Sequence, residues 1–147
     1  MRIPALTYAD ARLMTGARWV DLRSPAEFAR DHLPGAASVP LLDDDERALV
    51  GTLYKQVSPH AAFDRGLDFA AARLPALLTA LLGQQLPEAE WRERFAALAS
   101  RLREGAAAIE TELHSELPNH GQGWILLHCW RGGMRSRSVA ALLQSLG

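Results

Sequence analysis

The stretch "LLHCWRGGMRSRS", residues 126–138, combines an apolar run, the single cysteine of the chain, two adjacent glycines and three arginines. The apolar residues 124–128 have the length of a buried strand, and the sequence from about 135 to 146 has helical periodicity. Cys129 is therefore expected at the carboxyl end of a strand, just before a helix. Ligands of α/β sheets bind beyond the carboxyl ends of the strands. The stretch thus predicts a fold class and a site together.

The sequence before this stretch extends the same pattern. Residues 18–23, "RWVDLR", predict a short buried strand, and residues 24–27, "SPAE", form a capping box with proline at the first helical position, so a helix is expected from about 25 to 31. A second strand is expected near 37–39, and the long region 42–117 is largely helical in its periodicity. This order predicts an α/β fold with a mostly parallel central sheet flanked by helices.

Composition restricts the class of protein. The chain has 147 residues, 48% of them hydrophobic and 22% charged, which is typical of one soluble globular domain. A single cysteine excludes an internal disulfide framework, so a reducing, cytoplasmic setting is expected. The apolar runs are too short for a membrane span. The net charge of −1 argues against strong nucleic-acid binding by this chain alone, and the five histidines lack metal-ligand spacing.

The surroundings of Cys129 favour a reactive thiolate. The residues that follow it lead into a helix N-terminus, where free N–H groups favour negative charge. Gly132 and Gly133 allow successive N–H groups to point inward, and Arg131 and Arg135 can add charge-assisted hydrogen bonds. Such a loop both holds an anion and attacks an atom within it, because the thiolate is the nucleophilic form of cysteine. The alternative interpretation is that Cys129 is a small buried apolar residue.

Two segments resemble the motifs of rhodanese domains, and a third narrows the resemblance. The segment "VDLRSPAEFARDHLPGAASVPL" (20–41) resembles the opening rhodanese motif, and "HCWRGGMRS" (128–136) resembles the rhodanese active-site loop. The segment "DDDERALVGTLYKQVSPHAAFDRG" (43–66) is similar to the sequence that follows the first motif in tRNA 2-selenouridine synthases. The resemblance implies a single rhodanese-like domain over residues 1–147, with a helical insertion at about 42–117 between the second strand and the active-site strand.

The same resemblance implies an activity. Members of this family replace sulfur by selenium at the wobble 2-thiouridine of certain tRNAs. They use selenophosphate as the selenium donor and geranyl diphosphate through an S-geranylated intermediate. The expected partners are therefore tRNA and an enzyme that produces selenophosphate, and no cofactor is expected in this chain. The family also carries a P-loop domain, whereas this sequence contains no G-x-x-x-x-G-K-[ST] motif.

Site residues follow from the match to these motifs. Cys129 is the expected catalytic nucleophile and carrier of sulfur or selenium. The expected anion-binding and substrate-binding residues are Trp130, Arg131, Gly132, Gly133, Met134, Arg135 and Ser136. The expected supporting ion pairs involve Asp21, Arg23 and Glu27, and possible contacts with tRNA or the donor are Tyr54, Lys55 and Gln56. Arg135 has an alternative role, which is to pair with an acid at the edge of the sheet.

Other functions are compatible with the loop. The spacing of Cys129 and Arg135 also satisfies His-Cys-x5-Arg-Ser, the phosphate loop of cysteine-dependent phosphatases. A phosphatase needs a general acid, for which Asp43, Asp44 and Asp45 are candidates. A generic thiosulfate sulfurtransferase is another alternative, and a binding module without catalysis is a third.

Overall fold

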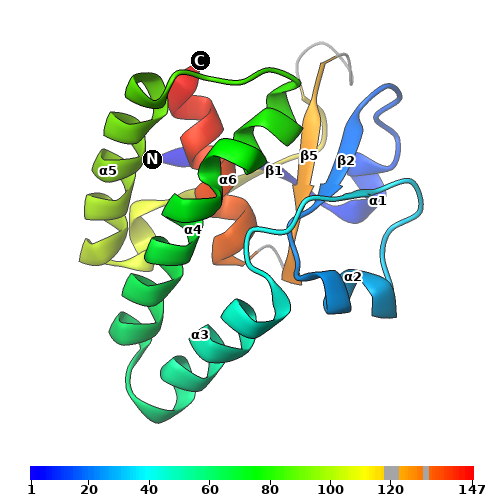
Figure 1. Ribbon diagram of the computed structural model, residues 1–147. Helices are drawn as coiled ribbons and strands as arrows, with labels where there is room; N and C mark the ends of the chain where they lie inside the picture. Colours follow the sequence, from blue (N-terminus) through cyan, green and yellow to red (C-terminus); the bar gives the residue numbers. More distant parts are fainter. Residues whose placement is uncertain (118–122, 131–132) are drawn as a thin grey trace.

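The computed structural model describes residues 1–117, 123–130 and 133–147 and is shown in Figure 1. Arg131 and Gly132, two expected loop residues, lie outside the described residues. The elements in chain order are β1 (Arg2–Leu6), α1 (Tyr8–Ala11), β2 (Arg18–Asp21), α2 (Pro25–Arg30), β3 (Ala37–Ser38), α3 (Asp44–Gln56), α4 (Pro59–Leu82), α5 (Glu88–Glu104), the 3₁₀ turn η1 (Ala106–Ala108), β4 (Glu110–His114), β5 (Ile125–His128) and α6 (Met134–Leu146).

The strands form two parallel sheets. One has the order β3-β2-β5, and the other pairs β1 with β4. The α/β class and the parallel pairing are confirmed, but the single central sheet expected from the sequence is divided, and β1 and β4 were not expected. The segment 42–117 is consequently not helical throughout, because it ends with β4. That strand is five residues long and four of them, in "ETELH", are charged or polar, so it has no apolar run.

The helix starts follow the local sequence signals. Ser24 and Glu27 form the expected capping box at the start of α2, with Pro25 in its first turn. Asp43 and Glu46 form a second capping box at the start of α3. In each box the glutamate side chain accepts the N–H of its N-cap residue, so two backbone groups that the helix leaves unpaired are satisfied.

Helix α4 continues through a proline. Its side-chain cap is Ser58, which accepts the N–H of Ala61, and its end is Gly83 in the left-handed conformation, with φ of 72°. Pro75 lies inside the helix and does not end it. Packing stabilises this helix, since Leu74, Leu77, Leu78 and Leu81 are all buried.

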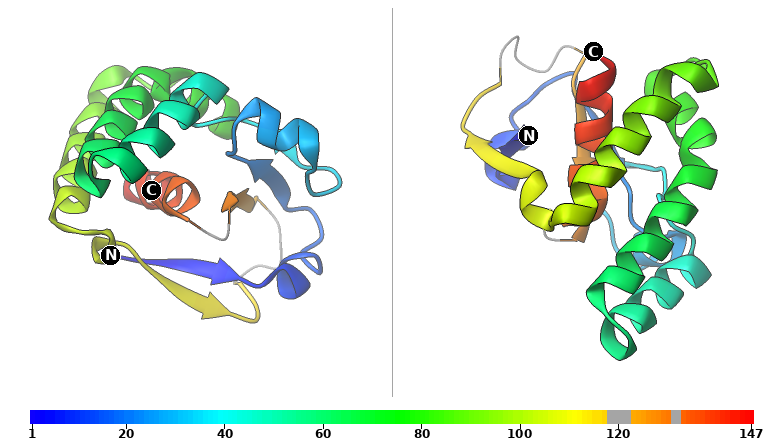
Figure 2. Two further views of the ribbon diagram at one scale, coloured as in Figure 1. Left: turned by 90° about the horizontal axis from the view of Figure 1, so that it is seen from below. Right: turned by 90° about the vertical axis from the view of Figure 1, so that its left-hand side faces the viewer.

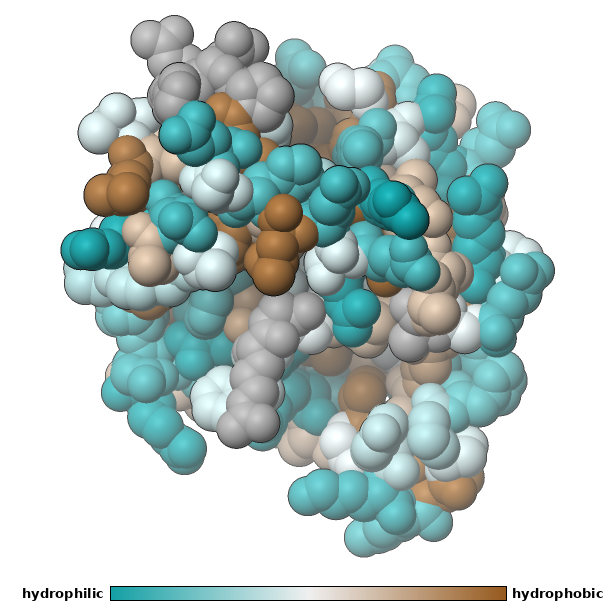
Figure 3. Space-filling model, turned by 180° about the vertical axis from the view of Figure 1, so that it is seen from behind, coloured by the Kyte–Doolittle hydropathy of each residue, from teal (hydrophilic) through white to brown (hydrophobic). Residues whose placement is uncertain are grey.

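The two sheets and the helices form layers, as Figure 2 shows. Helix α6 lies between the α4–α5 pair and the β1–β4 pair, and it contacts α5, β1 and β5. The core joins Val20 and Leu22 to the buried leucines of α4 and to Leu142 of α6. The face seen from behind in Figure 3 is mostly hydrophilic, with apolar residues in small groups. Among the described residues, none of the helices has the length and hydropathy needed to cross a membrane.

Two leucines of α4 provide a test of this packing. Leu78 is fully buried, whereas Leu82 is 39% exposed. We expect Leu78→Ala to lower the free energy of unfolding by about 2–5 kcal/mol, because it removes buried methyl groups and leaves a cavity. Leu82→Ala should change it by less than about 1 kcal/mol. Urea unfolding of both variants measures the difference, and equal losses would contradict the placement of α4.

Candidate active site

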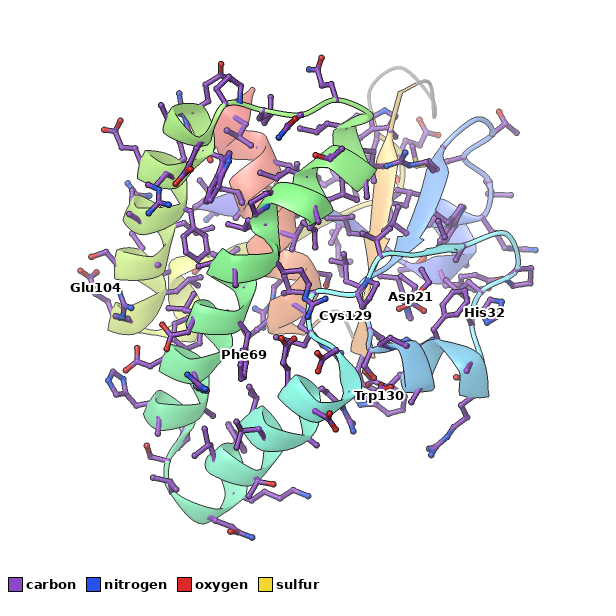
Figure 4. The ribbon with its side chains drawn as sticks, in the orientation of Figure 1. Asp21, His32, Phe69, Glu104, Cys129 and Trp130 are labelled. Carbon is purple, nitrogen blue, oxygen red and sulfur yellow. The ribbon has the colours of Figure 1, made fainter. Side chains whose placement is uncertain are left out.

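The cysteine lies where β5 leads into the loop before α6. Parallel pairing of β2 with β5 sets Asp21 beside His128, and Leu22 donates its N–H to the His128 carbonyl at 2.9 Å. Cys129, Trp130 and Asp21 are therefore at the same end of the sheet (Figure 4). The expected position of Cys129 at a strand end is confirmed by this geometry. Its side chain is buried, with 1% exposure.

The sulfur of Cys129 contacts the first turn of α6. The Ser136 N–H donates to Sγ at 3.4 Å, and the Ser136 hydroxyl lies 3.0 Å from Sγ. Sγ also lies 3.5 Å from the Gly133 carbonyl and 3.9 Å from the Trp130 carbonyl, as a thiol donor would. A backbone N–H at a helix N-terminus favours negative charge on the atom that it faces. The surroundings are thus polar and differ from those of a cysteine that only fills an apolar core.

The loop turns tightly at Gly133. Its N–H donates to the Trp130 carbonyl at 3.0 Å, and it is the N-cap residue of α6. A Cβ atom built at Gly133 would lie 3.0 Å from that carbonyl oxygen and 3.8 Å from Sγ. Met134 then begins the helix, and Trp130 is 60% exposed at the surface. Glycine is therefore favoured here, because a Cβ atom would have to displace the Trp130 carbonyl by a few tenths of an ångström.

Arg135 is held by an acid from a distant helix. Its two terminal nitrogens donate to the Glu27 carboxylate of α2 at 2.7 Å and 3.1 Å. The alternative role of Arg135 was to pair with an acid at the edge of the sheet; it does pair with an acid, but that acid lies on α2. Burial alone raises the pKa of Glu27, but hydrogen bonds from Arg135 and from the Ser24 N–H outweigh it and lower the pKa to about 2. Glu27 is consequently ionised across the physiological range.

Asp21 and Arg23 form a second ion pair beneath the loop. Arg23 donates to both Asp21 oxygens, at 2.7 Å to Oδ2 and 3.0 Å to Oδ1, and to the Asp31 carbonyl at 2.7 Å. Both side chains of the Asp21–Arg23 pair are buried. Burial raises the pKa of Asp21, whereas its hydrogen bonds from Arg23 lower it, and the net direction is downward. The His128 Nδ1 lies 3.7 Å from this carboxylate.

The polar residues Tyr54, Lys55 and Gln56 are not brought to the loop. Helix α3 approaches the site with its first turn, where the Asp44 carboxylate accepts the Ala26 N–H at 2.9 Å. The three residues lie in the last turn of the helix, about 15 Å further along its axis. They are exposed, and any contact they make with a large substrate is separate from the sulfur.

Sequence reasoning missed the part that α3 plays. Asp44 ties the first turn of α3 to α2, and Arg47 lies 3.6 Å from the Glu27 carboxylate. The run of acids at residues 43–46 indicates a helix start, but it does not identify the residues that these acids contact.

A cavity of about 860 Å³ reaches the same cysteine from the side of β1. Its walls include consecutive residues of two strands, Ile3–Leu6 and Ile125–His128, and it extends to Cys129, Ser136 and Arg137. Consecutive strand residues point to opposite faces, so the cavity follows the strand edges. Within the ranges that the structure describes, no strand pairs with this edge of β5, and no group of acidic, histidine or cysteine side chains is arranged to hold a metal ion.

Comparison with known proteins gives many similar sequences with one description. The chain is 34% identical over 146 residues to the tRNA 2-selenouridine synthase of Cronobacter sakazakii. It is 30% identical over 145 residues to that of Nitrosomonas europaea and 34% identical over 141 residues to that of Cupriavidus necator. These matches cover 95–99% of this chain but only 28–30% of the relatives, so the chain spans less than a third of their length. No protein-family model matches the chain.

A solved structure is similar over the whole chain. It is the crystal structure of the N-terminal domain of a protein described as an ATP/GTP binding protein from Clostridium difficile 630. The similarity has a TM-score of 0.64 and 26% sequence identity, and it covers 100% of this chain and 85% of that one. The sequence matches thus confirm the resemblance to tRNA 2-selenouridine synthases, and the structural match is consistent with a mixed α/β fold.

Substitution of Gly133 tests the geometry of the loop. We expect Gly133→Ala to lower the free energy of unfolding by about 1–3 kcal/mol, because the added methyl group meets the Trp130 carbonyl. Gly51→Ala is the matched control, since Gly51 lies inside α3 with nothing within 4 Å of a Cβ atom. That change should raise stability by about 0.5–1 kcal/mol. Urea unfolding measures both changes. An unchanged free energy of unfolding in Gly133→Ala would contradict the close approach of Gly133 to the Trp130 carbonyl.

The free energy of unfolding at low pH tests the Glu27–Arg135 pair. The folded-state pKa of Glu27 is about 2, below its ordinary value of 4.5. Its contribution to stability is therefore fully present above about pH 4.5 and is lost as the pH falls toward 2. We expect the free energy of unfolding of the wild type to exceed that of Glu27→Gln near neutral pH, and the difference to shrink in acid. Denaturant unfolding across this range measures it, and a constant difference would contradict the ion pair.

Proposed function

This chain is a homologue of one part of the tRNA 2-selenouridine synthases, and we propose that it supplies the reactive cysteine for replacing sulfur by selenium in tRNA. In this proposal residues 1–147 act as a rhodanese-like unit. The whole activity also involves the rest of the relatives' length, where the P-loop expected for the family would lie. The substrate is the wobble 2-thiouridine, the donor is selenophosphate, and geranyl diphosphate serves through an S-geranylated intermediate.

The contact between Ser136 and the sulfur carries the proposal. The Ser136 N–H donates to Sγ at 3.4 Å from the first turn of a helix. A fixed N–H at a helix N-terminus interacts favourably with the negative charge on a sulfur that acts as a nucleophile. A structural cysteine needs no such donor. The position of this contact in a segment similar to tRNA-modifying enzymes supports a catalytic role.

An oxyanion fits the same loop. Selenophosphate and thiosulfate are tetrahedral anions, and main-chain N–H groups between a strand end and a helix start bind such groups well. The Arg135 pair with Glu27 uses only N–H groups on its two terminal nitrogens. A guanidinium has five N–H groups, so the others can donate to an anion while the pair is kept. We assign Met134 and Ser136 to the anion cradle with Arg135, and Trp130 to its rim; Gly133 shapes the turn, since its N–H already donates to the Trp130 carbonyl.

Supporting residues hold the strand end in place. Asp21 and Arg23 are buried beside the loop and satisfy each other's charge. A buried ion pair of this kind stabilises a defined geometry more than it adds to net stability. We therefore assign Asp21, Arg23 and Glu27 to positioning and not to proton transfer. Tyr54, Lys55 and Gln56 are assigned to a tRNA contact away from the sulfur.

Two of the three candidate general acids of the phosphatase alternative, Asp43 and Asp44, are engaged in contacts at the start of α3, whereas Asp45 is exposed. Asp43 accepts the Glu46 N–H at 2.8 Å and lies 3.5 Å from Arg73. Asp44 accepts the Ala26 N–H at 2.9 Å. Both carboxylates thus hold α3 against neighbouring helices. The similarity to tRNA 2-selenouridine synthases makes selenium or sulfur transfer the better-supported function.

Formation of a persulfide on Cys129 tests the proposal. With thiosulfate, the Cys129 thiolate attacks the outer sulfur, an S–S bond forms, and the bond to the inner sulfur breaks so that sulfite leaves with its electron pair. We expect mass spectrometry of the digested protein to find one added sulfur atom on the peptide containing Cys129. Cys129→Ser should abolish it. Selenophosphate should compete with thiosulfate, because both anions occupy the same cradle.

Hydrolysis of an aryl phosphate separates the alternatives. A turnover that is lost in Cys129→Ser, without any persulfide in the wild type, would identify a phosphatase. If the wild type forms no covalent adduct and hydrolyses no ester, the chain acts as a binding module and the proposal is wrong.

A further inference from the structure

We infer that Glu27 is a positioning residue for Cys129, acting through Arg135 and the first turn of α6. Glu27 lies 108 residues from Arg135 in the sequence and belongs to a different helix. Within the part of the chain that the structure describes, the hydrogen bonds and ion pairs of Glu27 do not include the sulfur itself. The chain of contacts from Glu27 to Sγ nevertheless consists of two ion-pair hydrogen bonds, one peptide bond and one N–H···S contact. The inference deepens the proposed function, since it names what sets the geometry of that site.

The first link is a rigid carboxylate. One Glu27 oxygen, Oε2, accepts both the Ser24 N–H at 2.9 Å and an Arg135 N–H at 2.7 Å, and Oε1 accepts the other Arg135 N–H at 3.1 Å. The capping box therefore fixes the carboxylate before Arg135 reaches it. The Glu27 and Arg135 side chains are 15% and 19% exposed, so solvent screens the pair little. A bidentate arginine–carboxylate pair also fixes the orientation of both groups.

The second link is the start of α6. This helix has Gly133 as its N-cap and no side-chain capping hydrogen bond. Arg135 and Ser136 are adjacent residues of its first turn, so a movement of Arg135 moves the Ser136 N–H. That N–H and the Ser136 hydroxyl are the two atoms of α6 that hold Sγ, at 3.4 Å and 3.0 Å. The Glu27–Arg135 pair thus anchors the first turn of α6 to α2 and sets the position of the donors on the sulfur.

Glu46 provides a matched control within the same chain. Like Glu27, it is the third residue of a helix, its Oε2 accepts the N–H of its own N-cap residue, at 2.8 Å, and it pairs with a distant arginine, Arg73, at 2.8 Å. Its arginine belongs to α4, which carries none of the groups around the sulfur. Loss of the Glu46 carboxylate therefore removes the same kinds of interaction without touching α6.

The test compares Glu27→Gln, Glu46→Gln and Arg135→Lys in the full chain. The first readout is the amide resonance of Ser136 in two-dimensional NMR spectra, which reports the N–H···S geometry and needs no activity. We expect it to shift in Glu27→Gln and Arg135→Lys and to stay unchanged in Glu46→Gln. Arg135→Lys keeps the positive charge but loses the bidentate geometry, so its shift separates positioning from a simple charge effect.

The second readout is the rate of persulfide formation from thiosulfate. We expect Glu27→Gln to lower the rate at saturating donor by about 10- to 100-fold, the size of effect caused by a misplaced reacting group. The donor concentration at half-maximal rate should change less than about twofold. Glu46→Gln should match the wild type in both quantities, even though unfolding experiments should show a similar loss of stability in both glutamate variants.

Each outcome decides the inference. An unchanged Ser136 resonance in Glu27→Gln, or equal slowing by Glu27→Gln and Glu46→Gln, would overturn the positioning role. A weaker apparent affinity for the donor with an unchanged saturating rate would also overturn it, because Glu27 would then act in binding. If the wild type forms no persulfide, the proposed function fails, and the NMR comparison still decides whether Glu27 positions the sulfur.

Discussion

The parallel pairing of β2 with β5 is the constraint on which the site depends. It joins segments more than one hundred residues apart and sets Asp21 opposite His128. Both strands deliver their carboxyl ends to one edge, so the Asp21–Arg23 pair, the loop after Cys129 and the start of α2 meet there (Figure 4). A register shift by one residue would turn these side chains to the other face. The chemistry of the loop is therefore inseparable from the hydrogen bonds of two short strands.

Local signals in the sequence predicted the elements that begin with a cap. Ser24 with Glu27 predicted α2, since a helix N-terminus has unpaired N–H groups that nearby side chains can satisfy, and the acidic run at residues 43–46 is a signal of the same kind at the start of α3. The β1–β4 pair carried no comparable signal. "ETELH" is mostly exposed and polar, and "RIPAL" contains a proline, so neither has the pattern of a buried strand. Their pairing depends on chain regions far apart in sequence, which periodicity does not report.

The candidate site was predictable only where it depends on neighbouring residues in the sequence. The order of strand end, cysteine, glycines and helix was visible in the sequence, and the structure places Sγ beside the first turn of α6 as expected. Which acid Arg135 would meet was not visible, because ion-pair partners are decided by packing between helices. The distance of Tyr54–Gln56 from the sulfur was hidden as well. Three residues can belong to a segment that resembles the same family as the active-site loop and still lie at the far end of a helix.

Two helices of this chain begin with the same arrangement, and it has a consequence for how the protein acquires its structure. Glu27 and Glu46 each close a capping box and each accept an arginine from another helix. A capping box needs only four neighbouring residues, so it can form while most of the chain is still unfolded. The carboxylate has then already lost its rotamer freedom when the arginine arrives, and the long-range pair forms with a smaller entropy cost. Helix initiation and tertiary docking are in this way coupled through one side chain.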